Sequence, residues 1–433
     1  MLTSVIIALS TCALMITSIL FFPSIRLGKI KLDTYWIVAL LGALAIFLFG
    51  VIDFNYFFKA VTKNTSVNPL KILILFVSMT FLSIFLDEIG FFKYLANQTL
   101  RFSKGSQFRL FTTLYFSVSL LTVFTSNDII VLTFTPFICY FCKNAEINPV
   151  PYLIGEFVGA NTLSMMLIIG NPTNIYLATY YDINFIEYFR VMFLPTIVSA
   201  LVSYGILCLI FRKQLKKPSN PHSEKIVIEN VFLLIVGLVH LGVCTIMLAV
   251  SSFIGVEMWL ISLISAVSLF IISTATCLIK KRKLFSIGNV LKRVPWQLIP
   301  FMLSMFTLVL AVSYHGVTET ITSAIGTHGV VFKYGIASFL SANVINNIPM
   351  SVLFCELIAP LNSEFSALAV YSSIVGSNLG ALLTPIGALA GIMWIGMLKD
   401  FKVKLTFIDF VKYGAVISVG ALIPNLVILN FIL

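Results

Sequence analysis

Four short polar interruptions stand in an otherwise apolar sequence, and their residue types could bind a small solute. They read Ser126-Asn127-Asp128, Gly170-Asn171-Pro172-Thr173-Asn174, Asn346-Asn347-Ile348-Pro349 and Thr384-Pro385-Ile386-Gly387. Proline removes a backbone donor and breaks a helix, glycine lets the backbone approach a ligand closely, and amides or hydroxyls cap helix ends or donate to ligands. A single break of this kind is more often a kink, but four of them, two in each half of the chain, predict a binding site.

The residues of these breaks that present a polar side chain or a bare backbone are the candidate substrate ligands. They are Ser126, Asn127, Asn171, Thr173, Asn174, Asn346, Asn347, Thr384 and Gly387. Asn161, Asn343 and Asn378 are possible further members, although Asn161 and Asn378 could instead form hydrogen bonds between helices. We also predict that Asn127 and Asn347 face one shared site, because they hold matching positions in the two halves.

Two carboxylates lie within apolar segments and are candidates for ion coupling. Asp128 stands beside Asn127, and Glu156 precedes Asn161 by five residues. Charged residues inside membrane segments are functional candidates by default, since a carboxylate there can bind a proton or a cation. Asp128 could also serve as the cap of the helix that follows it.

The composition is that of an integral membrane protein. The chain has 433 residues, of which 59% are hydrophobic and only 10% charged, against about 25% charged in soluble domains. Apolar runs of about 20 residues, enough to cross the hydrocarbon layer, recur along the whole chain. A soluble enzyme is therefore excluded. The segment 1–22 has no basic region before it and is interpreted as a retained helix rather than a signal peptide.

The net charge and the potential metal-ligating residues limit the kinds of partner that this protein is expected to bind. The net charge of +11 comes from lysines and arginines in short loops, which is typical of cytoplasmic loops rather than of nucleic-acid binding. Among the seven cysteines, Cys139 and Cys142 have C-x-x-C spacing, but no second pair or histidine accompanies them, and the four histidines show no ligand spacing. We therefore expect a bilayer and a small solute as partners, with no metal, no cofactor and no nucleic acid.

The order of the segments predicts an internal repeat. The first half, 1–211, has a hairpin at about 108–142 and a broken helix at about 150–180. After a linker at 212–225, the second half, 226–433, has a hairpin at about 332–360 and a broken helix at about 364–398. Asn127 and Asn347, Asn161 and Asn378, and Pro172 and Pro385 are 220, 217 and 213 residues apart. This nearly constant offset indicates two copies of one unit.

The basic loops predict how the repeats are oriented. Five crossings and a re-entrant hairpin in each half place most basic loops in the cytoplasm and both termini outside. An odd number of crossings leaves the second repeat inverted. The expected fold is thus an all-α polytopic membrane protein with about ten spanning helices, two re-entrant hairpins and helices broken at the midplane. Four lysines contradict this orientation, namely Lys59, Lys63, Lys71 and Lys333.

The sequence resembles the arsenical pump membrane protein family of the ion transporter superfamily. That superfamily also contains citrate, dicarboxylate and sodium/proton carriers. The motifs are FLDEIGFFKYLA, SNDIIVLTFTPF, GANTLSMMLIIGNPTNIYLA, SANVINNIPMSVLF and GSNLGALLTPIGALAGIMW. They occur in order over roughly residues 80 to 430. The resemblance implies an inner-membrane carrier that forms a homodimer and exports arsenite or antimonite, driven by the proton gradient or by an ATPase subunit.

The resemblance has two departures that bear on the substrate. The arsenite branch usually has aspartates where this chain has Asn161 and Asn378. The loss of two charges would repel an anion less, so a proton- or sodium-coupled carrier of citrate or a dicarboxylate is the alternative to arsenite-type efflux.

Two other classes of function were weighed against a transporter. A channel is disfavoured because no ring-forming filter motif occurs, and two hairpins that enter from opposite sides suit alternating access. An intramembrane enzyme could in principle use Asp128 and Glu156 as paired carboxylates, but no nucleophile and base accompany them.

Overall fold

The chain folds into a bundle of helices, as seen in a computed structural model that describes residues 2–22, 24–27, 30–63, 68–103, 105–218, 228, 230–280 and 287–433. The first half contains α1 (Leu2–Phe21), α2 (Thr34–Leu48), α3 (Phe54–Thr62), α4 (Pro69–Glu88), α5 (Phe91–Ser103), α6 (Gln107–Phe124), α7 (Asn127–Asn144), α8 (Val150–Leu163), η1 (Ser164–Met166), η2 (Ile168–Gly170), α9 (Pro172–Tyr180), α10 (Phe185–Ile210) and α11 (Arg212–Leu215). The second contains α12 (Val231–Ala249), α13 (Ser251–Ile254), α14 (Met258–Lys280), α15 (Ile287–Arg293), α16 (Leu298–Tyr314), α17 (Val317–Ile325), α18 (Val330–Ile345), α19 (Asn347–Ile358), α20 (Ser363–Gly380), η3 (Pro385–Gly387), α21 (Leu389–Asp400) and α22 (Phe407–Ile432).

The predicted class, a helical polytopic membrane protein, is confirmed. Eight helices within the described residues are long and apolar enough to cross a membrane. The helices of the two broken segments are not among these eight, and the count of about ten crossings stays a prediction. Residues 219–225 of the predicted linker and the basic residues 281–283 lie outside the described part of the chain.

Two kinds of element were not expected from the sequence. Strands β1 (Ser24–Leu27) and β2 (Ile30–Asp33) pair antiparallel in a small hairpin. The polar stretches 87–107 and 315–331 contain the helices α5 and α17. Their apolar residues recur at helical spacing among the polar ones, and that periodicity was the available signal.

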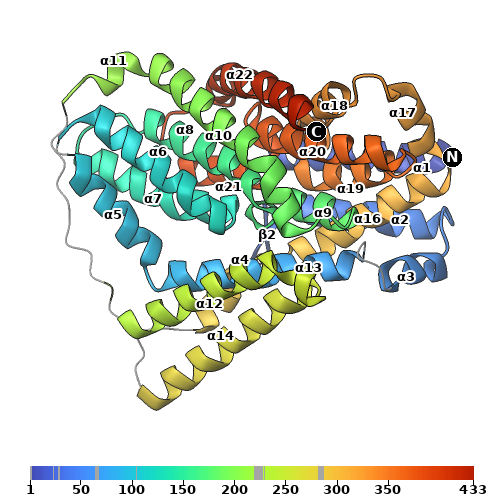
Figure 1. The fold of residues 1–433 in the computed structure, drawn as a ribbon, viewed down its shortest axis with the longest axis horizontal. Coiled ribbons are helices and arrows are strands. Elements are labelled where there is room, and N and C mark those ends of the chain that lie inside the picture. The colour runs from blue at the N-terminus through green and yellow to red at the C-terminus, as the bar shows by residue number, and fades with distance from the viewer. Residues whose placement is uncertain are drawn as a thin grey trace.

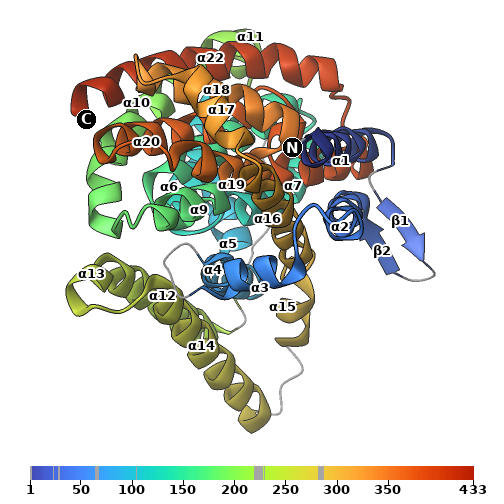
Figure 2. The ribbon, with the colours of Figure 1, turned by 90° about the vertical axis from the view of Figure 1, so that its right-hand side faces the viewer.

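The two halves share one order of elements and one set of neighbours. In the first half, α1 packs on α2, α6 on α8, and α8 on α10; in the second, α12 packs on α14, α18 on α20, and α20 on α22. Contacts between the halves are matched in the same way: α2 lies against α16 and α4 against α14, while α7 contacts α21 and α19 contacts α9. Helices α10 and α22 lie side by side along one side of the molecule, and α12 and α14 form an arm on the opposite side (Figures 1 and 2).

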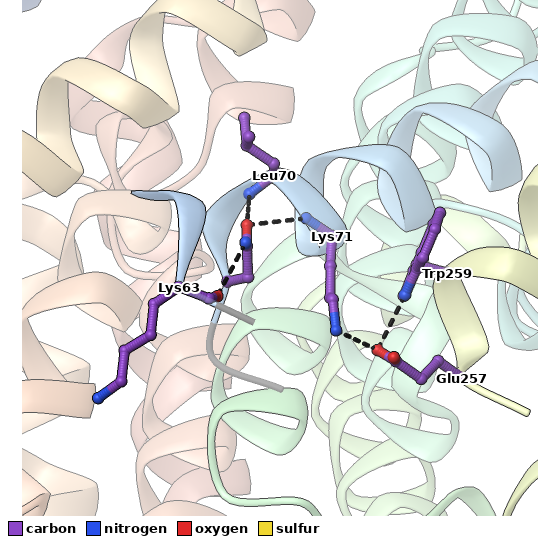
Figure 3. Close-up of polar contacts among 6 residues, drawn as sticks. Lys63, Leu70, Lys71, Glu257 and Trp259 are labelled. Carbon is purple, nitrogen blue, oxygen red and sulfur yellow. Dashed lines mark hydrogen bonds and ion pairs between the residues drawn. The ribbon is translucent and has the colours of Figure 1, made fainter. Parts of the chain in front are cut away.

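The long buried helix α4 is held to the second half at both of its ends. At its first turn, Asn68 caps the helix by accepting from the backbone N–H of Leu70, and Lys71 Nζ lies 2.6 Å from Glu257 Oε2, which also accepts from Trp259 (Figure 3). At its last turn, Arg293 of α15 pairs with Asp87 and with Glu88. Lys71, one of the four lysines that contradict the predicted orientation, is therefore neutralised by a partner.

The aromatic core joins the broken segments to the last helix. Phe157 of α8 and Trp394 of α21 are fully buried, and their ring centroids are 5.0 Å apart. Phe410 of α22 meets both rings edge-on. Since aromatic pairs of this geometry add to the stability gained from burial, these rings fix the positions of the helices that bear the polar breaks.

Candidate substrate and ion site at the helix breaks

The helices end at the positions where the sequence predicts breaks, and local chemistry accounts for each end. α6 ends at Phe124 and α7 begins at Asn127; α18 ends at Ile345 and α19 begins at Asn347. Asn171 caps α9, because its Oδ1 accepts from the backbone N–H and the hydroxyl of Thr173, and Pro172 occupies the first helical position. In the second broken helix, Asn378 lies on α20, which ends at Gly380, and the break that follows contains the predicted residues 384–387.

Asn346 bends the second hairpin at its tip. Its φ of 71° and ψ of 155° lie outside the left-handed helical region that asparagine commonly adopts, in a region that is almost restricted to glycine, so the backbone is strained at this residue. Its Nδ2 donates to the carbonyl of Ile386, 2.9 Å away, and its Oδ1 accepts from the N–H of Ile348. The side chain thus ties the hairpin tip to the break between α20 and α21.

A chain of amides and hydroxyls joins the first hairpin to both broken segments. Asn127 Nδ2 donates to Asn161 Oδ1 at 3.0 Å, and the hydroxyl of Ser164 donates to the carbonyl of Asn161. The same hydroxyl donates to Asn378 Oδ1 at 3.1 Å, which brings the second half into the network. Asn127, Asn161, Ser164 and Asn378 are all at least 99% buried. Asn161 and Asn378 therefore form hydrogen bonds between helices, as the sequence allowed.

Asn378 is the centre of this network. Its Oδ1 also accepts from Asn171 Nδ2 at 2.9 Å, and its Nδ2 donates to Asn174 Oδ1 at 2.7 Å and to the carbonyl of Ile374. Asn174 in turn donates to the carbonyl of Ser164. One side chain of α20 thus fixes both asparagines of the first break, more than 200 residues away in the sequence.

A second polar group lies between the second hairpin and its own broken helix. Thr384 donates its hydroxyl hydrogen to Asn343 Oδ1 at 2.7 Å, and Asn343 Nδ2 donates to the carbonyl of Gly380. A Cβ on Gly387 would lie 3.0 Å from Asn343 Oδ1, so a side chain at that position would crowd this contact. All three residues were candidate ligands in the sequence analysis, but their contacts with one another were not predicted.

The two candidate carboxylates occupy different surroundings. Glu156 is fully buried, and both of its oxygens lie 3.1 Å from the hydroxyl of Thr135. Asp128 lies in the first turn of α7, where Ser126 rather than Asp128 holds the cap position. It lines a cavity of about 680 Å³ whose walls do not include Glu156. Asp128 therefore does not hold the cap position of α7. Since only Asp128 lines this cavity, the two carboxylates do not share a surface on which they could act as a pair.

Both hairpin tips contain buried oxygens that lack a hydrogen-bond partner among the described residues. They are Ser126 Oγ, Asn127 Oδ1 and Asn347 Oδ1. Buried polar atoms are nearly always paired, and those that are not commonly mark a place where a ligand or ion binds. Asn127 and Asn347 are 1% and 3% exposed, so neither faces lipid, and their predicted common site stays a prediction.

Ser164 is the site residue that sequence reasoning missed. It follows Asn161 by three positions, which places both side chains on one face of a helix, and that spacing was the available signal. For metal ions, no group of three His, Cys, Asp or Glu side chains converges anywhere in the described residues.

Comparisons with known proteins place the chain among membrane transporters. The family model described as citrate transporter matches residues 25–376. The arsenical pump membrane protein of Yersinia enterocolitica is 25% identical over 378 residues, covering 81% of this chain and 84% of that protein. The putative arsenical pump membrane protein of Bacillus subtilis is 24% identical over 414 residues, covering 88% and 90%.

Two solved structures share the fold over nearly the whole chain. They are the YdaH transporter of Alcanivorax borkumensis, with a TM-score of 0.55, and MtrF of Neisseria gonorrhoeae, described as one of a class of antimetabolite efflux pumps, with a TM-score of 0.52. Each is 14% identical and covers 99% of this chain, which in turn covers 97% and 93% of theirs.

Proposed function

Because the chain belongs to the citrate transporter family, we propose that it is a secondary transporter that exports arsenite or antimonite in exchange for protons. The observation that carries this proposal is the uncharged network of amides and hydroxyls from Asn127 through Asn161 and Ser164 to Asn378. Arsenite is an uncharged trihydroxide at neutral pH. It can donate to amide oxygens and accept from amide nitrogens without needing a fixed cation. The relatives named arsenical pump membrane proteins support the same substrate.

Asp128 is the coupling residue in this proposal. It is next to the network member Asn127 and lines the 680 Å³ cavity. A carboxylate in this position can release a proton to one side of the membrane and take one up from the other when the hairpin tip changes its exposure. Glu156 has a supporting role, since it is buried beneath the hairpin and holds α8 against α7 through Thr135.

A carrier of citrate or a dicarboxylate is the second candidate. Four helices, α7, α9, α19 and α21, begin at the breaks, and helix N-termini attract anions. Lys292 and Arg293 also line the cavity that contains Asp128. In this alternative the orphaned oxygens of Asn127 and Asn347 would coordinate a sodium ion.

The architecture of the proposal is a pair of inverted repeats that alternate the access of one central site. The matched neighbours of the two halves support a two-fold relation, with α10 facing α22 and α4 facing α16 across it. Inverted repeats with broken helices are the usual basis of alternating access. Both termini outside the cell, a homodimer and an optional ATPase subunit belong to the same proposal.

The test is arsenite accumulation in energised everted membrane vesicles that contain the wild type, Asp128→Asn or the control Asp182→Asn. Asp182 is exposed in the loop after α9 and has no place in the network. We expect the wild type and the control to accumulate arsenite with a proton gradient. We expect Asp128→Asn to lose gradient-driven uptake and to retain exchange of labelled arsenite.

Two outcomes would change the assignment. If Asp128→Asn accumulates arsenite as the wild type does, Asp128 is not the coupling residue. If wild-type vesicles take up citrate but no arsenite, with or without sodium, the second candidate replaces the first.

A further inference from the structure

The cavity beside Asp128 has a second wall that belongs to other helices. Its volume is about 680 Å³, and it lies between the first hairpin tip, which contributes Ser126 and Asp128, and the helices α2 and α4, which contribute Trp36 and Thr80. The start of α16 and the residues Lys292 and Arg293 complete it. It is large enough for a small hydrated solute.

Three polar atoms from three elements around this cavity lack a hydrogen-bond partner in the described residues. They are Nε1 of Trp36, Oγ1 of Thr80 and Oγ of Ser126. Each is withdrawn from bulk solvent, and a buried polar group without a partner is destabilising. Because the three residues share the walls of one cavity, a single solute bound there could pair with all three atoms.

Two residues of the same types elsewhere in the chain are satisfied locally. The hydroxyl of Thr307 in α16 donates to the carbonyl of Leu303 one turn earlier, whereas Thr80 makes no such bond. Ser106 caps α6 by accepting from the N–H of Arg109, whereas Ser126 holds the cap position of α7 without a side-chain bond. Thr80 and Ser126 are thus the members of these pairs whose hydroxyls remain for a ligand.

We infer that this cavity is a loading subsite for the transported species, with Trp36 and Thr80 as specificity-determining residues that line it together with Asp128. The inference rests on the proposed function and adds residues from α2 and α4 to it. The indole N–H can only donate, the carboxylate of Asp128 accepts when it is ionised, and the hydroxyls can do both. A solute that fits must therefore combine acceptor oxygens with hydroxyl donors, as arsenite and antimonite trihydroxides do. Citrate, with one hydroxyl and three carboxylates, matches this set less well.

Two exposed basic residues, Lys292 and Arg293, also line the cavity. Arg293 is paired with Asp87 and Glu88, whereas Lys292 has no ion pair in the described part of the chain. A fixed positive charge does not select a neutral trihydroxide. Selection therefore falls to the uncharged donors of the wall.

The experiment measures binding and transport by Trp36→Phe and Thr80→Val, which remove the donor and keep most of the shape. The matched controls are Trp259→Phe, whose indole N–H donates to Glu257, and Thr307→Val, whose hydroxyl bonds within its own helix. Arsenite, antimonite and citrate are titrated into purified protein by calorimetry, and the initial transport rate is measured in vesicles. Thr80→Ser, which restores the hydroxyl, serves as the rescue variant.

We expect Trp36→Phe and Thr80→Val each to weaken arsenite binding about three- to tenfold, as the loss of one neutral hydrogen bond predicts. KM should rise by the same factor with kcat unchanged, and Thr80→Ser and both controls should bind like the wild type. If the wild type binds arsenite and both variants match it, the subsite is refuted while the proposed function stands. If the wild type binds citrate but not arsenite or antimonite, or binds none of the three, both are refuted.

Discussion

Removal of the Asn378 side chain tests whether the hydrogen-bond network between the two halves is required for transport. Asn378→Ala would leave Asn171 Nδ2 and Asn174 Oδ1 without the partner that the structure gives them, in a place with no solvent. A buried unsatisfied group costs about 1–3 kcal/mol in proteins, and polar contacts between membrane helices average about 0.6 kcal/mol. We therefore expect a loss of roughly 1–4 kcal/mol of stability, short of complete unfolding.

The matched control is Asn425→Ala. Asn425 is also fully buried and also joins the halves, because its Nδ2 donates to the carbonyl of Pro195 and to the hydroxyl of Ser199. It lies between α10 and α22, where neither helix is divided by a break. Both variants should melt earlier in detergent, so the melting temperature alone cannot separate a structural role from a functional one.

Transport per folded molecule separates the two roles. Asn378→Ala releases both asparagines of the first break, and misplaced groups commonly reduce rates by roughly 100-fold. Asn425→Ala leaves the breaks in place, so its folded fraction should transport arsenite at nearly the wild-type rate in everted vesicles. The reasoning is refuted if Asn378→Ala, corrected for the folded amount, transports like the wild type, or if both variants lose transport equally.

Two further substitutions test the packing around the site. Gly376→Ala should prevent folding or assembly in the membrane, because the added Cβ would collide with the backbone of α18. The control Gly205→Ala, whose added Cβ would meet nothing within 4 Å, should be neutral or stabilising by up to about 1 kcal/mol. Expression level and monodispersity in detergent measure the effect of each substitution. Lys71→Ala should lower the stability by less than about 1 kcal/mol, since Glu257 is half exposed. Hydrogen bonding to Lys71 lowers the pKa of Glu257. The stability that this pair contributes is therefore present above the ordinary glutamate pKa and is lost as the pH falls through the lowered pKa. The melting temperatures of the wild type and Lys71→Ala should thus differ at neutral pH and become equal only at acidic pH.

The positions of the breaks could be predicted from the sequence because their causes are local. Pro172 fixes the first turn of α9, Asn171 caps it, and Asn346 adopts a positive φ, each through its own side chain or the next residue. The recurrence of the same residue types at a nearly constant offset also predicts an internal repeat, which stays a prediction.

Which amides meet could not be predicted in the same way. The partners of Asn378 stand 204, 207 and 214 residues earlier in the chain, so their contacts depend on how α20 packs against the first break. The sequence alone left open that Glu156 and Asp128 act as paired carboxylates, whereas in the structure Thr135 contacts Glu156 and Asp128 lines the cavity. Ser164 was missed because its three-residue spacing from Asn161 indicates a shared helix face but not its contact with Asn378 in the other half.

The two halves differ in one respect that bears on the coupling mechanism. Asn127 and Asn347 hold matching positions at the hairpin tips, and each has an orphaned Oδ1. The residue after Asn127 is Asp128, whereas the residue after Asn347 is Ile348. A symmetric pair of tips suffices to hold an uncharged solute between them, but a charge on only one tip makes the two sides of the site unequal. Protonation of Asp128 would then remove that inequality, so the state of one carboxylate could decide which hairpin releases the solute.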